Sequence, residues 1–161
     1  MSFQPKASVV VPVAADTPPA LVDVARQYAK DATALHILHV VPSVVTYDPA
    51  GLWASAPNPQ RFDVIHNALT ERFGVHQLGA RVVVRLGDAA VEVARYAQDV
   101  AAELIVLASH QRRGVSRWFL GSVAEETLRR APCPVLLLRL TDLERPVDNR
   151  TPPDLRAGPA A

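Results

Sequence analysis

Five short apolar runs, spaced through the first 140 residues, constrain the fold of this chain more than any other feature. They are rich in valine, leucine and isoleucine and nearly continuous: 8–13, 34–41, 81–86, 103–109 and 134–140. A strand with one solvated face alternates apolar and polar residues, whereas continuous apolar runs are typical of strands covered on both faces of a parallel sheet. The runs therefore predict five buried parallel strands.

The segments between these runs carry apolar residues at helical spacing. Four stripes stand out: 21–29, 62–73, 93–101 and 123–131. We expect Thr17 to cap the first helix, Gly74 to end the second and Gly87-Asp88 to precede the third. Strands alternating with helices predict an α/β domain, an open parallel sheet with right-handed crossovers and helices on both faces.

Two segments lack such periodicity. Residues 42–60 contain four prolines, and we expect them to form a long loop, which in a compact domain is often a lid, a contact surface or a mobile segment. Residues 141–161 are rich in proline and charge. We expect a domain over 1–140 and a largely disordered tail over 141–161.

Charge and composition exclude several classes of protein. The formal net charge is +1, with 17 Lys and Arg against 16 Asp and Glu, so the basic field of a nucleic-acid-binding protein is missing. No apolar run is long enough for a membrane span, and the N-terminus lacks the pattern of a secretory signal. A single cysteine, Cys133, excludes an internal disulfide. We expect a cytoplasmic protein.

The segment before the fourth helix offers a site for an anion. Ser122 and Glu125 have the spacing of a capping box, and Arg112, Arg113 and Arg117 come just before them. A helix N-terminus preceded by guanidinium groups is suited to phosphate. The same serine and glutamate are equally explained as a folding signal, so capping alone and anion binding both stay open.

The same segment resembles the C-terminal signature of universal stress proteins. Ala108-Ser109-His110-Gln111 is followed by nine residues, Gly121-Ser122, a helix and Ala131-Pro132-Cys133-Pro134-Val135. Val11-Pro12-Val13, His39-Val40 and Gly87-Asp88 extend the resemblance over residues 8–139. It implies an adenine-nucleotide alpha hydrolase-like fold with strand order 3-2-1-4-5. It also implies a site for ATP or another adenine nucleotide at Pro12, Val13, Ala14, Val40, Ala108, Ser109, His110, Gln111, Arg112, Arg113, Gly114, Gly121, Ser122 and Val123.

Three departures make this nucleotide motif degenerate. ATP-binding members have glycine where this chain has Ala108 and Gln111, and aspartate where it has Ala14. Glycine allows close approach of the backbone to phosphate, and the aspartate is directed at the nucleoside. Our leading expectation is a stress-response module that binds an adenine nucleotide. The alternatives are a dimeric interaction protein of the same family that does not bind ATP, and a weak nucleotide hydrolase.

Neither a catalytic pattern nor a set of metal ligands emerges from the sequence. We find no paired nucleophile and base, no Walker motif and no cluster of metal-binding side chains, so binding is favoured over catalysis. The last strand is too apolar for an open edge. As the family resemblance also implies, we expect a homodimer paired through Val135, Leu136, Leu137 and Leu138, with an unidentified protein as a possible further partner.

Overall fold

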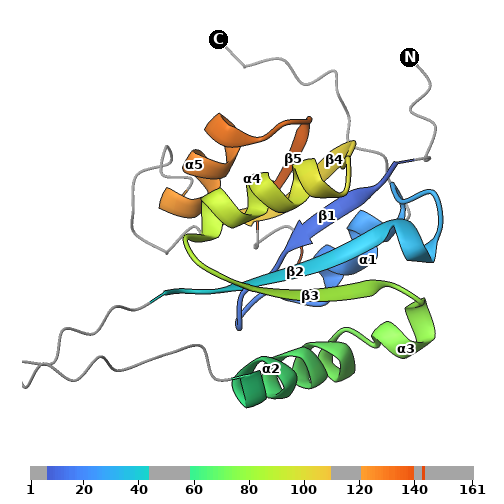
Figure 1. Ribbon diagram of the computed structural model, residues 1–161. Coiled ribbons are helices and arrows are strands. Elements are labelled where there is room, and N and C mark those ends of the chain that lie inside the picture. Colours follow the sequence, from blue (N-terminus) through green and yellow to red (C-terminus); the bar gives the residue numbers. More distant parts are fainter. Residues whose placement is uncertain (1–6, 44–58, 110–120, 140–142, 144–161) are drawn as a thin grey trace, which may run out of the picture.

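Five parallel strands form one sheet in the order β3-β2-β1-β4-β5 (Figure 1). The computed structural model describes residues 7–43, 59–109, 121–139 and Leu143. The strands are β1 Val9–Pro12, β2 Leu35–Val41, β3 Arg81–Leu86, β4 Leu104–Ser109 and β5 Val135–Arg139. The predicted fold class, strand number and strand order are confirmed, and the strand ends differ from the predicted ones by at most one residue.

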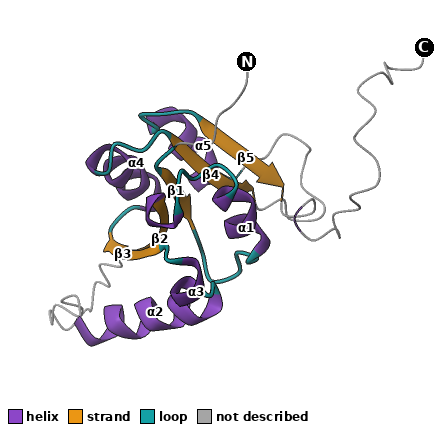
Figure 2. Cartoon of the chain, turned by 90° about the vertical axis from the view of Figure 1, so that its right-hand side faces the viewer, coloured by secondary structure: helices purple, strands orange, loops and turns teal. Residues whose placement is uncertain are grey.

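In the described part of the chain, five α-helices cover the two faces of this sheet (Figures 1 and 2). They are α1 Ala20–Arg26, α2 Pro59–Arg72, α3 Val75–Leu78, α4 Ala89–Asp99 and α5 Ser122–Arg130. The first three pack on one face, and α4 and α5 lie together on the other. Right-handed crossovers produce this division, because the chain moves outward from β1 to β3 and then returns past β1 to β4.

Three consecutive valines show why the apolar runs are continuous. Val9, Val10 and Val11 of β1 are each 0% exposed. Val9 and Val11 pack in the core layer beneath α1 and α2, and Val10 packs in the layer beneath α4. Side chains alternate between the faces of a strand, so a strand between two helical layers needs apolar residues at every position.

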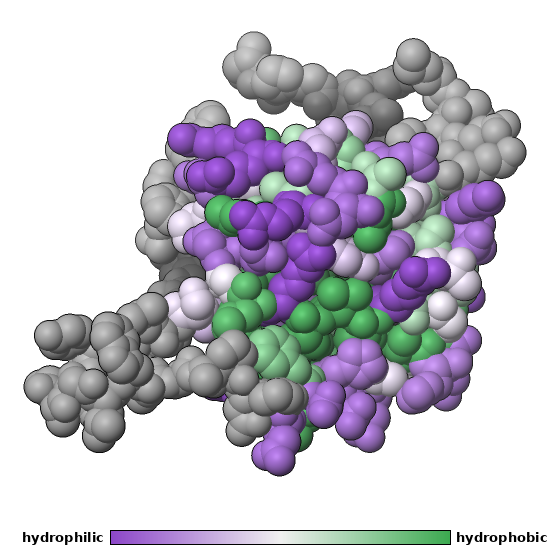
Figure 3. Space-filling model, in the orientation of Figure 1, coloured by the Kyte–Doolittle hydropathy of each residue, from purple (hydrophilic) through white to green (hydrophobic). Residues whose placement is uncertain are grey.

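The edge strand β3 is less well covered than the centre of the sheet. Its three valines are half-buried, and Arg81 and Leu86 at its ends are exposed. Figure 3 shows apolar side chains gathered on this side of the molecule, between α4 and α2. The sheet thus has its best-shielded strands, β1 and β4, at its centre, where the carboxyl ends of strands from both halves of the fold meet.

Helix boundaries agree with the sequence at the start of α4 and the end of α2, and they differ at α1 and α3. Asp88 caps α4, its carboxylate accepting from Val91 N–H at 3.0 Å, and Gly74 follows α2 in the left-handed conformation. Thr17 does not cap α1, whose N-cap is Pro19. The short helix α3, which lies between Gly74 and Gly79, was not predicted, because four residues are too few to show a periodicity.

A polar pair is buried between β2 and α4. Nδ1 of His36 lies 2.8 Å from the Tyr96 hydroxyl, in a hydrogen bond. Burial lowers the pKa of His36 below its usual 6.5, with a smaller contribution from the positive charge of Arg81. His36 therefore belongs to the core of the fold, as its position in a strand favours.

Membrane-spanning helices and the C-terminal tail are two features that the described residues cover only in part. Within the ranges given above, no helix is both long enough and apolar enough to cross a membrane. The tail predicted to be disordered lies outside the described residues except for Leu143, which packs against the core layer of α1 and α2. The boundary of the domain at residue 140 stays a prediction.

Candidate functional site

A pocket of about 300 Å³ opens beyond the carboxyl ends of the strands. It is lined by the ends of β1, β2 and β4 and by the starts of α4 and α5. At this point the strand order reverses, since the chain leaves β1 for β2 on one side and later enters β4 on the other. Open parallel sheets bind their ligands at such switch points.

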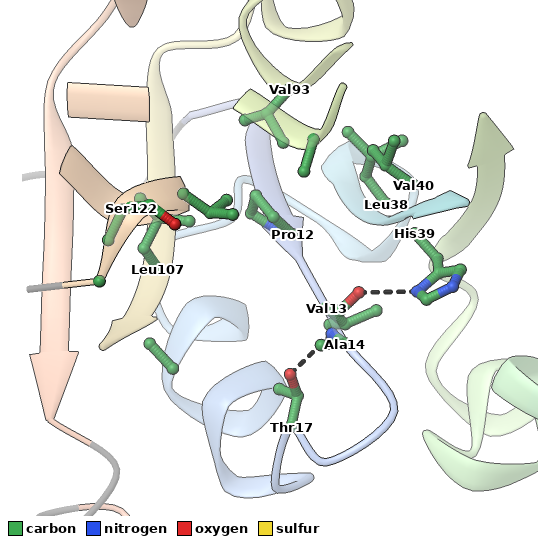
Figure 4. Close-up of a pocket in the computed structure, with 15 residues that line it drawn as sticks. Pro12, Val13, Ala14, Thr17, Leu38, His39, Val40, Val93, Leu107 and Ser122 are labelled. Carbon is green, nitrogen blue, oxygen red and sulfur yellow. Dashed lines mark hydrogen bonds between the residues drawn. The ribbon is translucent and has the colours of Figure 1, made fainter. Parts of the chain in front are cut away.

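The floor of the pocket is also part of the hydrophobic core. Leu38, Val93 and Leu107 line it and belong to the core layer beneath α4. Figure 4 shows Val93 and Leu38 on one side of Pro12 and Leu107 with Ser122 on the other. Because these side chains are apolar and packed, the floor offers a flat organic group a surface for burial and no hydrogen-bonding side chain.

The turn between β1 and α1 forms a second wall. Thr17 is 2% exposed, and its Oγ1 accepts from the Ala14 N–H at 2.8 Å (Figure 4). Arg72 of α2 donates to the carbonyls of Ala15 and Thr17, the latter at 2.8 Å. The threonine hydroxyl is thus hydrogen-bonded within the turn, and the Arg72 guanidinium holds the turn through its two carbonyl groups.

The β1–β2 ladder ends at the rim of the pocket. Val13 N–H donates to the Leu38 carbonyl at 2.8 Å, and the last strand pair is Pro12 with Leu38. Beyond it, the Val13 carbonyl is 2.8 Å from Nδ1 of His39. A carbonyl oxygen only accepts, so Nδ1 of His39 carries the proton of this bond. The side chain of Val40, one residue on, lines the pocket.

The start of α5 closes the pocket on the side of β4. Gly121 is the N-cap, with φ 91° and ψ 140°, and as a glycine it makes no side-chain capping bond. Helical bonding begins with Glu125 N–H donating to the Gly121 carbonyl at 3.0 Å. The predicted capping box is therefore wrong, since Ser122 is the first helical residue. The amides of Ser122, Val123 and Ala124 precede that first bond and have no acceptor within the helix.

The structure brings together eight of the residues predicted for the nucleotide site. These line the pocket: Pro12, Val13, Ala14, Val40, Ala108, Gly121, Ser122 and Val123. Ser109 is 1% exposed and is absent from the lining. The remaining five lie outside the described residues: His110, Gln111, Arg112, Arg113 and Gly114.

Sequence reasoning missed seven other lining residues: Thr17, Leu38, His39, Ala89, Val93, Leu107 and Ala124. Two of these had a usable signal. Leu38 lies two residues before Val40 on β2, so it shares a face with a residue already assigned to the site. Ala124 falls in the first turn of a helix whose preceding residues were assigned. Thr17 had been assigned to a different role.

Among the described residues, the lining carries little charge. His39 is the only titratable side chain among the described residues that line the pocket. Within the described ranges, no three His, Cys, Asp or Glu side chains come close enough to hold a metal ion. An apolar floor beside a helix N-terminus can bury a planar group and solvate an anion attached to it.

Comparison with known proteins agrees with this geometry. The sequence matches the universal stress protein family over residues 7–139. Universal stress protein G of Escherichia coli O157:H7 is 29% identical over 119 residues, which are 69% of this chain and 81% of that protein. Universal stress protein MJ0531 of Methanocaldococcus jannaschii is 24% identical over 120 residues, 73% of this chain and 70% of its own length.

The solved structures give the same result for the fold. A universal stress protein from Archaeoglobus fulgidus superimposes with a TM-score of 0.52 at 19% identity, covering 80% of this chain and 96% of that one. The family match extends from two residues before β1 to the last residue of β5 and so includes every strand that builds the pocket. This chain belongs to the universal stress protein family.

Proposed function

We propose that this protein is a stress-response binding module whose pocket holds an adenine nucleotide, with the base over the apolar floor and the phosphate at the start of α5. The observation that carries the proposal is the pocket itself, which joins a buried apolar floor to the amides of Ser122, Val123 and Ala124. Such amides and the helix dipole favour a phosphate. A solved universal stress protein of the same fold, with a TM-score of 0.51 at 24% identity, is in complex with cAMP.

The backbone of Val40 supplies the polar contact that the floor lacks. Gly87 N–H donates to the Val41 carbonyl, so the peptide groups of Val41 point toward β3. The N–H and C=O groups of successive residues along a strand point to opposite sides. Those of Val40 therefore point toward the side of β1, beyond the last residue pair between β1 and β2. One N–H and one C=O facing the pocket match the acceptor and the amino group on the Watson–Crick edge of adenine.

Titration calorimetry with AMP, cAMP and ATP tests this proposal. Ala89 lines the pocket at the start of α4, so Ala89→Trp should fill the space and abolish binding. Val64→Trp is a matched control, because Val64 is 67% exposed on α2 and does not line the pocket. Absence of heat with every nucleotide at millimolar concentration, or equal binding by both variants, would refute the site.

A second function, a dimeric protein that binds no nucleotide, is favoured by Ala14. This residue lines the pocket, and its methyl group offers no hydrogen bond to a sugar or base. Ala14→Asp distinguishes the two functions. If the pocket is a nucleotide site that lacks one contact, the carboxylate should tighten binding about tenfold, the value of one charge-assisted hydrogen bond. If the protein serves only in protein interaction, Ala14→Asp should still bind no nucleotide.

For either function we propose a homodimer through β5, the outer strand of the sheet beside β4 (Figure 2). Ile105 N–H donates to the Pro134 carbonyl, which places the Leu137 N–H on the open side of β5. Leu137→Pro removes that donor without breaking the ladder to β4. Light scattering should show a dimer for the parent and for Leu137→Val, and a monomer for Leu137→Pro. A parent that is monomeric at micromolar concentration would exclude this pairing.

A further inference from the structure

The ladder between β1 and β2 stops one hydrogen bond earlier than its register allows. In a parallel ladder, a residue that donates its N–H to one partner accepts at its carbonyl from the residue two positions further along that strand. Val13 N–H donates to the Leu38 carbonyl, so the next bond would run from Val40 N–H to the Val13 carbonyl. The pairing nevertheless ends with Pro12 and Leu38.

A side chain takes the place of the missing donor. Nδ1 of His39 lies 2.8 Å from the Val13 carbonyl, and Figure 4 shows the imidazole beside Val13 at the rim of the pocket. The half-buried His39 thus bonds back to β1 with its ring, while the peptide N–H of the following residue is left facing the end of that strand.

We propose that His39 is a positioning residue, whose bond to the Val13 carbonyl keeps the N–H and C=O of Val40 open for the edge of a 6-aminopurine. This inference rests on the proposed nucleotide function. It names the residue that leaves the N–H and C=O of Val40 available to the base. The histidine also lines the pocket, and in this role it acts through the Val13 carbonyl. It occupies the Val13 carbonyl, which by the register of the ladder would otherwise accept from Val40 N–H and continue the sheet across the mouth of the pocket.

The bond has a defined chemical requirement, which gives the test its variants. The donor must be the atom attached to Cγ, since Nδ1 makes the contact. His39→Asn places an amide nitrogen at that position and keeps the bond. His39→Gln carries its nitrogen one atom further out, near the place of Nε2, and His39→Leu has no donor. The first variant is the conservative replacement, and the other two should release the Val13 carbonyl.

Amide hydrogen exchange in the nucleotide-free protein tests the positioning role directly. Val40 N–H should exchange rapidly in the parent and in His39→Asn, and about tenfold or more slowly in His39→Gln and His39→Leu, where it closes onto the Val13 carbonyl. The Val13 N–H, bonded to Leu38, should stay protected in all four proteins and so reports that the ladder is intact. A Val40 amide that is protected in the parent, or unchanged in His39→Leu, would overturn the inference.

Calorimetry with AMP then connects this change to binding. The affinity of His39→Asn should stay within about twofold of the parent, and the other two variants should bind about tenfold more weakly, as expected for loss of one hydrogen bond. Retained affinity in His39→Leu would overturn the role in binding. If the parent itself binds no adenine nucleotide, the proposed function fails on that result, while the exchange rates still decide whether His39 holds the ladder open.

Discussion

The first turn of α5 gives the sharpest test of the site's geometry, because the sequence and the structure assign its cap to different residues. The sequence pattern makes Ser122 the capping residue, whereas the structure makes Gly121 the N-cap with no side-chain bond. Replacing each residue by alanine separates these assignments. Gly121→Ala should destabilise the protein, and Ser122→Ala should leave its stability almost unchanged.

The magnitudes follow from the backbone of Gly121. Residues other than glycine rarely adopt a backbone conformation with φ 91° and ψ 140°, and placing alanine in it costs about 1–3 kcal/mol. A Cβ added there meets no atom of the described residues within 4 Å, so these residues add no steric clash to this cost. Alanine also lowers the conformational entropy of the unfolded chain, which stabilises the folded protein by about 0.4–1 kcal/mol. We therefore expect a net loss of roughly 0.5–2 kcal/mol for Gly121→Ala.

Ser122→Ala should behave differently because its hydroxyl makes no capping bond. Alanine is the better helix former by up to about 0.5 kcal/mol, so the change should be neutral or slightly favourable. Loss of a true serine cap would instead cost about 0.5–2 kcal/mol. Urea unfolding followed by far-UV circular dichroism gives both free energies, provided that the slopes agree. A loss of 1 kcal/mol or more in Ser122→Ala, with Gly121→Ala as stable as the parent, would refute the assignment.

Three further predictions concern the fold around the pocket. Thr17→Val should cost about 1–3 kcal/mol in urea unfolding, because it leaves the Ala14 N–H without its acceptor, and Thr17→Ser should retain most of that stability. The lowered pKa of His36 means that the unfolded chain takes up a proton first as the pH falls, so stability should decline below pH 6.5 until the folded histidine also protonates. His36→Gln should reduce the loss of unfolding free energy between about pH 7.5 and about pH 5.5. An equal loss in the parent and the variant would contradict the burial of a neutral imidazole. Ile37→Ala, at a fully buried position, should cost about 2–5 kcal/mol by chemical denaturation, against less than about 0.5 kcal/mol for the exposed Val64→Ala.

The strands could be predicted from the sequence because their signal is local and redundant. Val9, Val10 and Val11 are buried on alternate faces, and an unbroken apolar run is what such a strand requires. The order of the strands came from a family signature that spans most of the chain. Both signals depend on the type of residue at each position and not on any particular side-chain geometry.

The details of the site could not be obtained in this way. Whether Ser122 or Gly121 caps α5 depends on the direction from which the chain enters the helix, and the motif Ser-x-x-Glu is the same in both cases. Thr17 bonds backward to Ala14 instead of forward into α1, a choice that the following two prolines do not reveal. The contact between His39 and Val13 joins residues 26 positions apart in sequence. Such contacts are set by the register of the sheet.

The division of the pocket into a floor and a rim bears on how this family can diversify. Leu38, Val93 and Leu107 are shared between the floor and the core, so changing them would lower the stability of the whole domain. Ala14 and Val123 lie at the rim, outside both core clusters. Substitutions at the rim can therefore accumulate at little cost to folding, so that the chemistry of the pocket mouth can change while the scaffold stays the same.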